Sequence, residues 1–290
     1  MIDRRVLPDP YLQKTLDGHV FKRLRNESVE QVREELAAGA YDGIAFSPYG
    51  PDFQTVNEGW KGDINAFLSA GLKAKIVRIA YADRMGFRLE SLAHVEGIEQ
   101  LMLGDFSGRC TLSLPLIKDM SVGLSDGLDL GELPNLKNAQ LYQPRAKHLK
   151  QLALSAPGLQ QLAIFDSPVA DIAEIANLTR LSSIELGSLK KLKRIAALAQ
   201  IAALKEIVID TARSISDLNQ TLHACRGLEK VTLVKTPPLR SWEWIETQNL
   251  KSLICLEMSF PHSRHPRMAD ISHVDLTRSV IKEMVRTLVE

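Results

Sequence analysis

The chain has 290 residues, of which 45% are hydrophobic and 24% are charged, and this composition excludes a wholly disordered protein. The 36 Lys and Arg residues balance 35 Asp and Glu residues, so the net charge of +1 gives no general basic field for nucleic acid or anionic lipid. No segment has the pattern of a signal peptide or a membrane span. We therefore expect a cytoplasmic protein that does not enter a membrane.

The first 71 residues alternate between helical and strand patterns. Ser28 and Gln31 mark the start of a helix that runs up to Gly39. Residues 41–46 predict a strand, and residues 63–72 predict a second helix. Residues 1–26 are basic and carry Arg4, Arg5, Lys22, Arg23 and Arg25.

A repeated pattern of apolar residues occupies residues 72–258. The chain contains 42 leucines, and the motif apolar-x-x-apolar-x-apolar recurs in steps of 19 to 24 residues. The motifs begin at Ala74, Ile98, Ile117, Leu136, Leu159, Leu181, Leu204, Leu228 and Leu250. Within each motif the alternation is that of a short strand with one buried face, and a turn and helical spacing follow it. We expect strands that stack in parallel.

This pattern resembles the leucine-rich repeat family. The resemblance implies an α/β fold, a right-handed and curved solenoid with a parallel sheet on its concave face and helices or helical turns on its convex face. It places about nine repeats at 72–258, between an N-terminal cap with degenerate repeats at 1–71 and a C-terminal cap at 259–290. In that second cap a loop precedes an amphipathic helix over 275–290.

Two details of the repeats depart from the family pattern. Many leucine-rich repeats have Asn three residues after the last strand leucine, whereas this chain has none there and has residues such as Ser167 and Thr236 instead. We therefore expect the ladder to be either missing or carried weakly by Ser and Thr, and the coil to be irregular. The units between residues 98 and 135 are short, so a full helix is not expected in them.

Motifs that would support catalysis are missing from the sequence. Neither a Gly-rich phosphate loop nor a G-x-S-x-G turn is present. His262 and His265 lie in a Pro-flanked loop without an acidic or cysteine partner at a metal-ligand spacing. Cys225 is expected to be a small buried apolar residue, and the run from Lys190 to Arg194 a solvated surface. We expect no catalytic residue, metal or cofactor.

The strand alternation directs every second side chain toward the concave face, starting with Ile76 in the first repeat. Tyr142 and Phe165 occupy the same column in neighbouring repeats, as aromatic anchors of binding sites often do. Acidic residues outnumber basic ones around them. The predicted partner-binding residues are Arg78, Met102, Asp119, Gln140, Tyr142, Phe165, Glu185, Glu206, Asp210 and Lys230.

These features predict a non-catalytic module that binds a protein on its concave face, where a basic partner would be complementary in charge. Proteins similar to it act as scaffolds, effectors or inhibitors that fill an enzyme's active site, so a stoichiometric inhibitor or immunity protein is one specific form. Two alternatives stay open. One is an enzyme or regulator of a phosphorylated or metal-dependent ligand that uses the loop histidines or the basic terminus, and the other is a structural adaptor. Nucleic acid and small-molecule substrates are not favoured.

Overall fold

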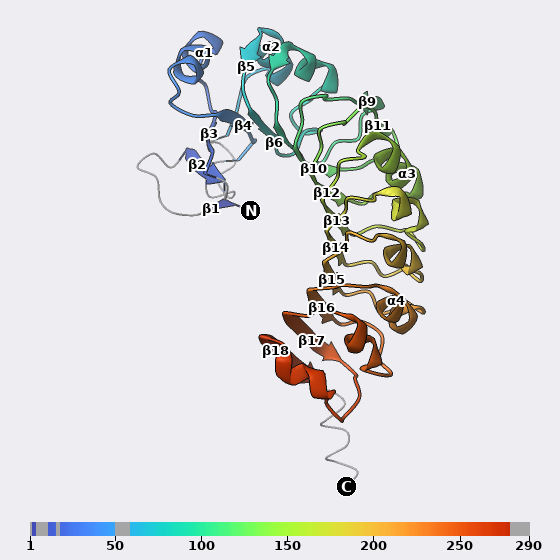
Figure 1. Ribbon diagram of the computed structural model, residues 1–290. Coiled ribbons are helices and arrows are strands. Elements are labelled where there is room, and N and C mark those ends of the chain that lie inside the picture. Colours follow the sequence, from blue (N-terminus) through green and yellow to red (C-terminus); the bar gives the residue numbers. More distant parts are fainter. Residues whose placement is uncertain (1, 4–10, 16–17, 50–58, 279–290) are drawn as a thin grey trace, which may run out of the picture. The chain divides into compact units, whose positions relative to one another are not determined.

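The computed structural model describes residues 2–3, 11–15, 18–49 and 59–278 and divides the chain into two compact units, Met1–Leu136 and Lys137–Glu290 (Figure 1). We call them unit 1 and unit 2. The division falls inside the predicted repeat segment, and the cap boundaries at 71/72 and 258/259 remain predictions. None of the helices in the described ranges has the length and apolarity needed to cross a membrane.

Unit 1 contains mostly short elements. They are β1 (Ile2–Asp3), β2 (Leu12–Thr15), β3 (Val20–Arg23), α1 (Val29–Ala37), β4 (Gly43–Phe46), α2 (Ile64–Ser69), β5 (Leu72–Lys73), β6 (Ile76–Ile79), the 3-10 helix η1 (Leu89–His94), β7 (Val95–Glu96), β8 (Gln100–Leu103), β9 (Cys110–Leu112), β10 (Asp119–Gly123) and β11 (Leu128–Leu130). The main sheet runs in the order β1-β2-β3-β4-β6-β8-β10 and is parallel from β3 onward.

The short units of residues 98–135 contain no helix, as their length predicts. Strands β9 and β11 pair in parallel there and take the place of helices behind β8 and β10. The predicted N-terminal elements are also confirmed, because α1, β4 and α2 fall within the three predicted segments. Ser28 caps α1 by accepting a 3.2 Å hydrogen bond from the backbone N–H of Gln31.

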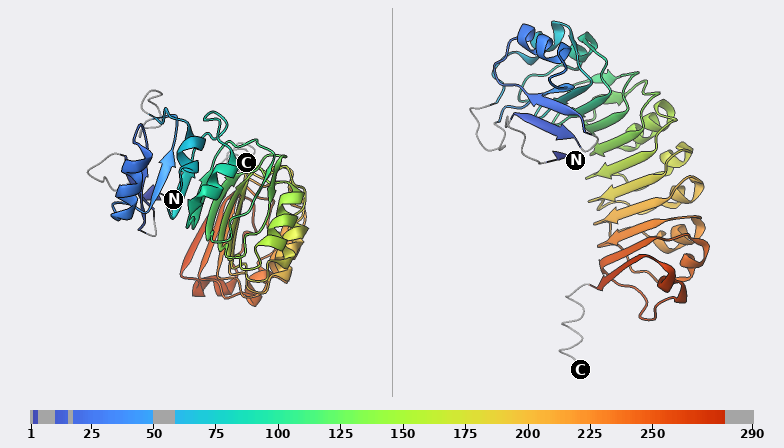
Figure 2. Two further views of the ribbon diagram at one scale, coloured as in Figure 1. Left: turned by 90° about the horizontal axis from the view of Figure 1, so that it is seen from above. Right: turned by 60° about the vertical axis from the view of Figure 1, so that its left-hand side comes forward.

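Unit 2 repeats one strand and one helical segment. Its elements are β12 (Asn138–Tyr142), α3 (Ala146–Ser155), β13 (Gln161–Phe165), η2 (Ala173–Asn177), β14 (Ser183–Gly187), η3 (Ala196–Gln200), β15 (Glu206–Asp210), α4 (Leu218–Ala224), β16 (Lys230–Val234), η4 (Glu243–Thr247), β17 (Ser252–Met258), η5 (Pro266–Asp270) and β18 (His273–Arg278). All of these strands pair in parallel with the next one in sequence. Figure 2 shows them side by side, from green to red.

The core of unit 2 consists of columns of aliphatic side chains on one side of the strands. One such column is fully buried and runs through paired residues of successive strands, Leu141, Ile164, Leu186, Ile209, Leu233 and Cys255. Each helical segment covers this side with further buried residues, such as Leu152 and Leu198. A single repeat cannot bury its own two apolar faces. The repeats are therefore stable only when neighbouring repeats stack on both sides of each one.

The turn that follows each strand has the same backbone conformation in successive repeats. Five non-glycine residues after β12 to β16 have φ between 50° and 57°, in the left-handed region that side chains disfavour. The first four donate their N–H to the carbonyl of the residue that ends the next strand, as Asp166 does to Gly187 and Thr211 to Val234, and Lys235 donates to Leu256 within β17. These five residues are Gln143, Asp166, Ser188, Thr211 and Lys235. The repeated turn keeps the side-chain columns in register up to the ends of the strands.

The weak Ser and Thr ladder predicted from the sequence is present at two positions. The Ser167 hydroxyl is buried, donates to the carbonyl of Pro144 in the preceding repeat and accepts from the N–H of Val169. The Thr236 hydroxyl contacts the Met258 sulfur of the following repeat at 3.3 Å. Ser167 therefore bonds to the backbone of a neighbouring repeat, as asparagine does in regular repeats, whereas Thr236 contacts only a side chain of the next repeat.

The C-terminal prediction is wrong where the structure can be described. Residues 275–278 belong to strand β18, which pairs in parallel with β17, and not to a helix. Val274 and Leu276 alternate with the polar residues His273, Asp275 and Thr277, which is the period of a strand. Residues 279–290 of the expected helix lie outside the described residues.

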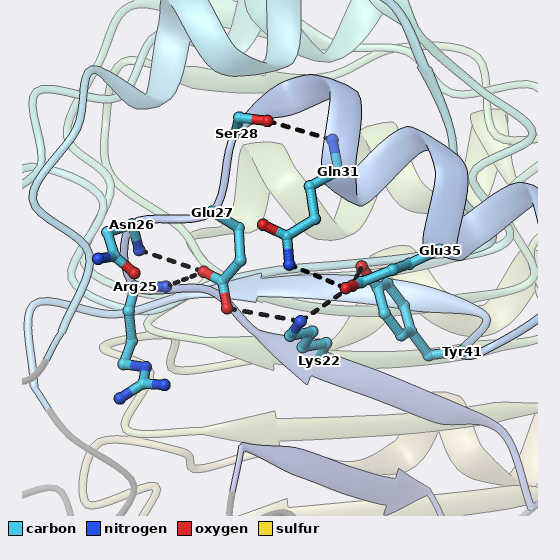
Figure 3. A network of polar contacts seen from close by, with 8 residues as sticks. All are labelled: Lys22, Arg25, Asn26, Glu27, Ser28, Gln31, Glu35 and Tyr41. Carbon is cyan, nitrogen blue, oxygen red and sulfur yellow. Dashed lines mark hydrogen bonds and ion pairs between the residues drawn. The ribbon is translucent and has the colours of Figure 1, made fainter.

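Three of the predicted basic residues near the N-terminus, Lys22, Arg23 and Arg25, lie within the described part of the chain. The Lys22 Nζ atom lies 2.9 Å from the Glu35 carboxylate and 3.5 Å from that of Glu27 (Figure 3). The Arg25 guanidinium lies 3.8 Å from the ring centroid of Tyr11. Arg23 is buried. Lys22 and Arg23 therefore do not contribute to an open basic surface for a phosphorylated ligand, whereas Arg25 is exposed; Arg4 and Arg5 lie outside the described residues.

Glu35 is the hub of this network (Figure 3). Although burial raises its pKa, hydrogen bonds from Gln31, Lys22 and Tyr41 outweigh that effect and lower it to about 2. The hydrogen-bond partner Tyr41 shifts in the other direction. Burial and the hydrogen bond to Glu35 raise the pKa of the Tyr41 hydroxyl. The network thus holds α1 against β3 and the start of β4.

We expect the Glu35→Gln variant to weaken α1 at neutral pH by about 1–2 kcal/mol, because it replaces a charged acceptor of three hydrogen bonds. A carboxyl with a lowered folded-state pKa stabilises above its unfolded pKa near 4.5, and this contribution disappears as the pH falls toward about 2. Hydrogen exchange of the α1 amides measures the effect. The control Glu34→Gln, at an exposed neighbouring position, should leave exchange unchanged, and equal protection in both variants would contradict the role of Glu35.

Candidate functional site

The alternate side chains of β12 to β17 form the side of unit 2 opposite the aliphatic columns. These are the positions predicted to line the concave face, and we call this side the outer face of the sheet. Seven of the ten predicted partner-binding residues lie on it. They are Gln140, Tyr142, Phe165, Glu185, Glu206, Asp210 and Lys230. The other three, Arg78, Met102 and Asp119, belong to the sheet of unit 1.

The predicted neighbourhood of Tyr142 and Phe165 is confirmed. They are paired residues at the ends of β12 and β13, and their rings stack with centroids 5.3 Å apart and an interplanar angle of 26°. Tyr142 is 39% exposed and Phe165 is half-buried. The amide of Gln140 donates to the Tyr142 hydroxyl at 2.7 Å and fixes the position of that ring. An ordered aromatic pair therefore stands on a face that otherwise carries polar, charged and some aliphatic side chains.

Gly187 gives the aromatic pair its position. It pairs with Phe165 in the register, and a Cβ atom there would lie 2.5 Å from Cδ1 of Phe165. The ring thus occupies the space that a side chain at position 187 would take. Because Asp210 is the partner of Gly187 in the next strand, the ring leans toward a carboxylate. Sequence reasoning did not find this role, although a glycine at the end of one strand column was visible in the repeat alignment.

Carboxylates of neighbouring strands gather beside the rings. Burial raises the pKa of Glu185, and the charges of Asp210 and Glu206 raise it further. Burial likewise raises the pKa of Tyr142, with Glu185 and Asp166 adding to the shift against the Gln140 hydrogen bond. The negative potential is therefore strong enough to act on two different side chains of the outer face.

Cations of the chain neutralise only part of this potential. Lys230 lies 3.9 Å from Glu206, and Asp210 accepts a 2.8 Å hydrogen bond from the Thr211 hydroxyl. No hydrogen bond or ion pair joins the Glu185 carboxylate to another residue in the described ranges. Glu185 and Asp210 are both exposed, so the outer face carries two accessible carboxylates next to the aromatic pair.

The three predicted residues of unit 1 have different surroundings. Arg78 is half-buried with its guanidinium 4.2 Å from the ring centroid of Phe21, and its strand neighbour Ile76, expected on an open face, is fully buried. That expectation was wrong because Phe21 and Ala45 pack with Ile76 into one cluster. Met102 is 38% exposed and Asp119 is half-buried. They remain predicted binding residues, with no aromatic pair like that of unit 2.

The histidine and cysteine residues outside the outer face that could be reactive have structural roles or are buried. His265 caps η5 by accepting from the N–H of Arg267, and its Nε2 lies 3.4 Å from Glu246. Burial raises the pKa of the Cys225 thiol to about 11 and that of Cys255 to about 12, so neither is a thiolate at neutral pH. In the part of the chain that the structure describes, no group of three or more His, Cys, Asp or Glu residues could hold a metal ion.

Comparison with known proteins gives distant structural neighbours only. No family model matches the chain, and no curated protein sequence does. One similar solved structure is an internalin (inlF) from Listeria monocytogenes, with 17% identity over 74% of this chain and 70% of that chain and a TM-score of 0.46. Another is the plant peptide hormone receptor RGFR1 in complex with RGF2, with 12% identity over 86% of this chain and 60% of that one and a TM-score of 0.22.

The repeated register, and not these distant neighbours, identifies the fold. Successive strands of unit 2 pair in parallel without a shift up to Leu256, at the spacing that the leucine motif has in the sequence. A helical segment follows each of the strands β12 to β17 along the chain. The chain has the α/β fold of a leucine-rich repeat solenoid.

Proposed function

We propose that this chain is a non-catalytic protein-binding protein that uses the outer face of unit 2 to hold a partner with a basic surface. The observation that carries the proposal is the stacked Tyr142–Phe165 pair beside the exposed carboxylates of Glu185 and Asp210. Rigid aromatic side chains are frequent anchors of protein interfaces, and uncompensated charge steers an opposite charge to them.

A stoichiometric inhibitor or immunity protein is the specific form of this function that the acidic outer face favours. An enzyme that acts on nucleic acid needs a basic cleft, and such a cleft is complementary to Glu185 and Asp210. An anionic ligand such as nucleic acid itself would be repelled by the same carboxylates. No observation favours the loop histidines as a catalytic site, since His265 already caps η5 and contacts Glu246.

Affinity capture from the native source tests the proposal. The test variant combines Tyr142→Ala, Phe165→Ala, Glu185→Lys and Asp210→Lys, all on the outer face. We expect the unaltered protein to capture a stoichiometric partner and the variant to lose it, with a deficit that grows at low salt, where steering is strongest. Circular dichroism establishes that the variant is folded.

A matched control carries the same charge change elsewhere on unit 2. It combines Leu154→Ala with Glu243→Lys and Asp270→Lys, at exposed positions of α3, η4 and η5. The control should retain the partner. If the control loses the partner and the outer-face variant keeps it, recognition lies on the other side of unit 2 and the proposal is wrong. A partner without which the chain cannot be purified would instead indicate a structural adaptor.

A further inference from the structure

The outer face of unit 2 has a local arrangement that distinguishes one cationic side chain from another. Three features lie together there: the stacked rings of Tyr142 and Phe165, the side-chain-free position of Gly187, and the carboxylates of Glu185 and Asp210. The first offers aromatic surface, and the last offers hydrogen-bond acceptors that are exposed to solvent. A planar cation can use both features at once, because its face can stack on a ring while its N–H groups donate to the carboxylates.

We propose that this arrangement anchors the partner through an arginine side chain, whose guanidinium stacks on the Tyr142–Phe165 pair and donates to the carboxylates of Glu185 and Asp210. The inference rests on the proposed function and specifies which residue of the partner the outer face recognises. The guanidinium is planar, weakly hydrated and able to donate two parallel hydrogen bonds, whereas an ammonium is a compact and strongly hydrated charge.

The strand register places the two carboxylates close enough to the Phe165 ring for one guanidinium to contact both the ring and a carboxylate. Glu185 precedes Gly187 by two residues on β14, and Asp210 is the pairing partner of Gly187 on β15. Both carboxylates therefore border the position over which the Phe165 ring leans. Neighbouring strands are about 4.8 Å apart, so one guanidinium can contact the ring and a carboxylate of the next strand at the same time.

Neighbouring charges make the arrangement receptive to a cation. Burial and the charges of Asp210 and Glu206 raise the pKa of Glu185, which means that its ionised form lacks compensation. Lys230 lies on the neighbouring strand β16, and its ammonium group pairs with the Glu206 carboxylate at 3.9 Å. A cation from the partner would supply the compensation that Glu185 and Asp210 lack.

Unit 1 uses the same kind of contact within the chain. The Arg25 guanidinium lies 3.8 Å from the ring centroid of Tyr11, and that of Arg78 lies 4.2 Å from the centroid of Phe21. Aromatic rings of this protein thus already pack against arginine where the chain supplies one. On the outer face of unit 2 the residues that surround Phe165 in the register are Tyr142, Ala163 and Gly187, and none is cationic.

Short blocked peptides test the proposal with the full chain. The probes are acetyl-Gly-Arg-Gly-amide, its lysine analogue and its uncharged citrulline analogue, titrated into protein labelled with 4-fluorophenylalanine. The Phe165 fluorine signal is assigned with the Phe165→Leu variant. We expect the arginine peptide to shift this signal with an affinity about fivefold higher than that of lysine, which corresponds to a stacking preference near 1 kcal/mol. Citrulline should not shift it.

Two variants complete the test. Glu185→Gln with Asp210→Asn keeps the rings and the shape but removes both charges, and it should abolish the preference for arginine; Glu243→Gln, an exposed residue of η4, should not. Equal shifts from arginine and lysine, or an arginine shift that survives the double variant, would overturn the proposal. If a partner is captured through the outer face without arginine selectivity, only this inference fails. If arginine selectivity exists but no outer-face partner is captured, only the proposed function fails.

Discussion

Replacement of Leu186 by alanine is expected to cost about 2–5 kcal/mol in the free energy of unfolding of unit 2, the largest effect that we expect for a single substitution. Leu186 is fully buried in the aliphatic column between Ile164 and Ile209. Removal of its side chain leaves a cavity that the neighbouring strands cannot fill without a change of register. Urea denaturation measures the loss, and hydrogen exchange should increase first in β13 to β15.

The control for this substitution is Leu154→Ala, because Leu154 lies on α3 and is 74% exposed. It removes the same atoms and should change stability by less than about 0.5 kcal/mol. The pair of variants also tests the register. A shift of one residue would place Leu186 on the outer face and Glu185 in the core, because side chains alternate along a strand. A Leu186→Ala cost as small as that of Leu154→Ala would therefore contradict the strand assignment on which the site depends.

The second large effect concerns binding. Phe165→Ala should lower the affinity for the captured partner about 30-fold or more, the loss typical of an anchor residue, while folding is preserved. Phe165 is half-buried on the outer face, and its ring contacts Tyr142 and the backbone space above Gly187. Titration calorimetry with the purified partner measures the change. Phe165→Leu, which keeps apolar volume but removes the aromatic face, separates stacking from simple burial.

Gly187→Ala provides an independent view of the same contact. The added Cβ would lie within 2.6 Å of two Phe165 ring atoms, both at the movable end of a side chain, so the ring must move while the backbone stays. Weaker binding of this variant, with unchanged stability, would show that binding of the partner depends on the orientation of the Phe165 ring. Unchanged affinity in both Phe165→Ala and Gly187→Ala would remove the aromatic pair from the interface.

The sequence predicted the strands and their register well because repetition carries that information. Tyr142 and Phe165 occupy equal offsets from Leu136 and Leu159, and equal offsets in stacked repeats become neighbours on a sheet. One repeat was missed at the C-terminus. Residues Ile271, Val274 and Leu276 fit the same motif, and β18 occupies that position. The apolar spacing of residues 280–288 fits a helix, and the predicted helix was extended back over the strand-like alternation of residues 273–277.

Contacts between segments that do not repeat could not be predicted in this way. The packing of Lys22 against Glu35 depends on how α1 lies against β3, and the burial of Ile76 depends on Phe21 of that same strand. Phe21 and Lys22 precede the first motif and have no equivalent in the other repeats. The acidic potential around Tyr142 was visible in the sequence, whereas the lean of Phe165 over Gly187 required the register and the ring position together.

Hydroxyl-radical footprinting of unit 2 with and without the captured partner tests the central claim most directly, because it reports which side chains a partner covers. The outer-face account predicts strong protection of Tyr142 and Phe165 in the complex and unchanged oxidation of Leu154, which is highly exposed on α3. Protection of Leu154 with unchanged oxidation of Tyr142 and Phe165 would contradict it, and would place recognition on the helical side of unit 2.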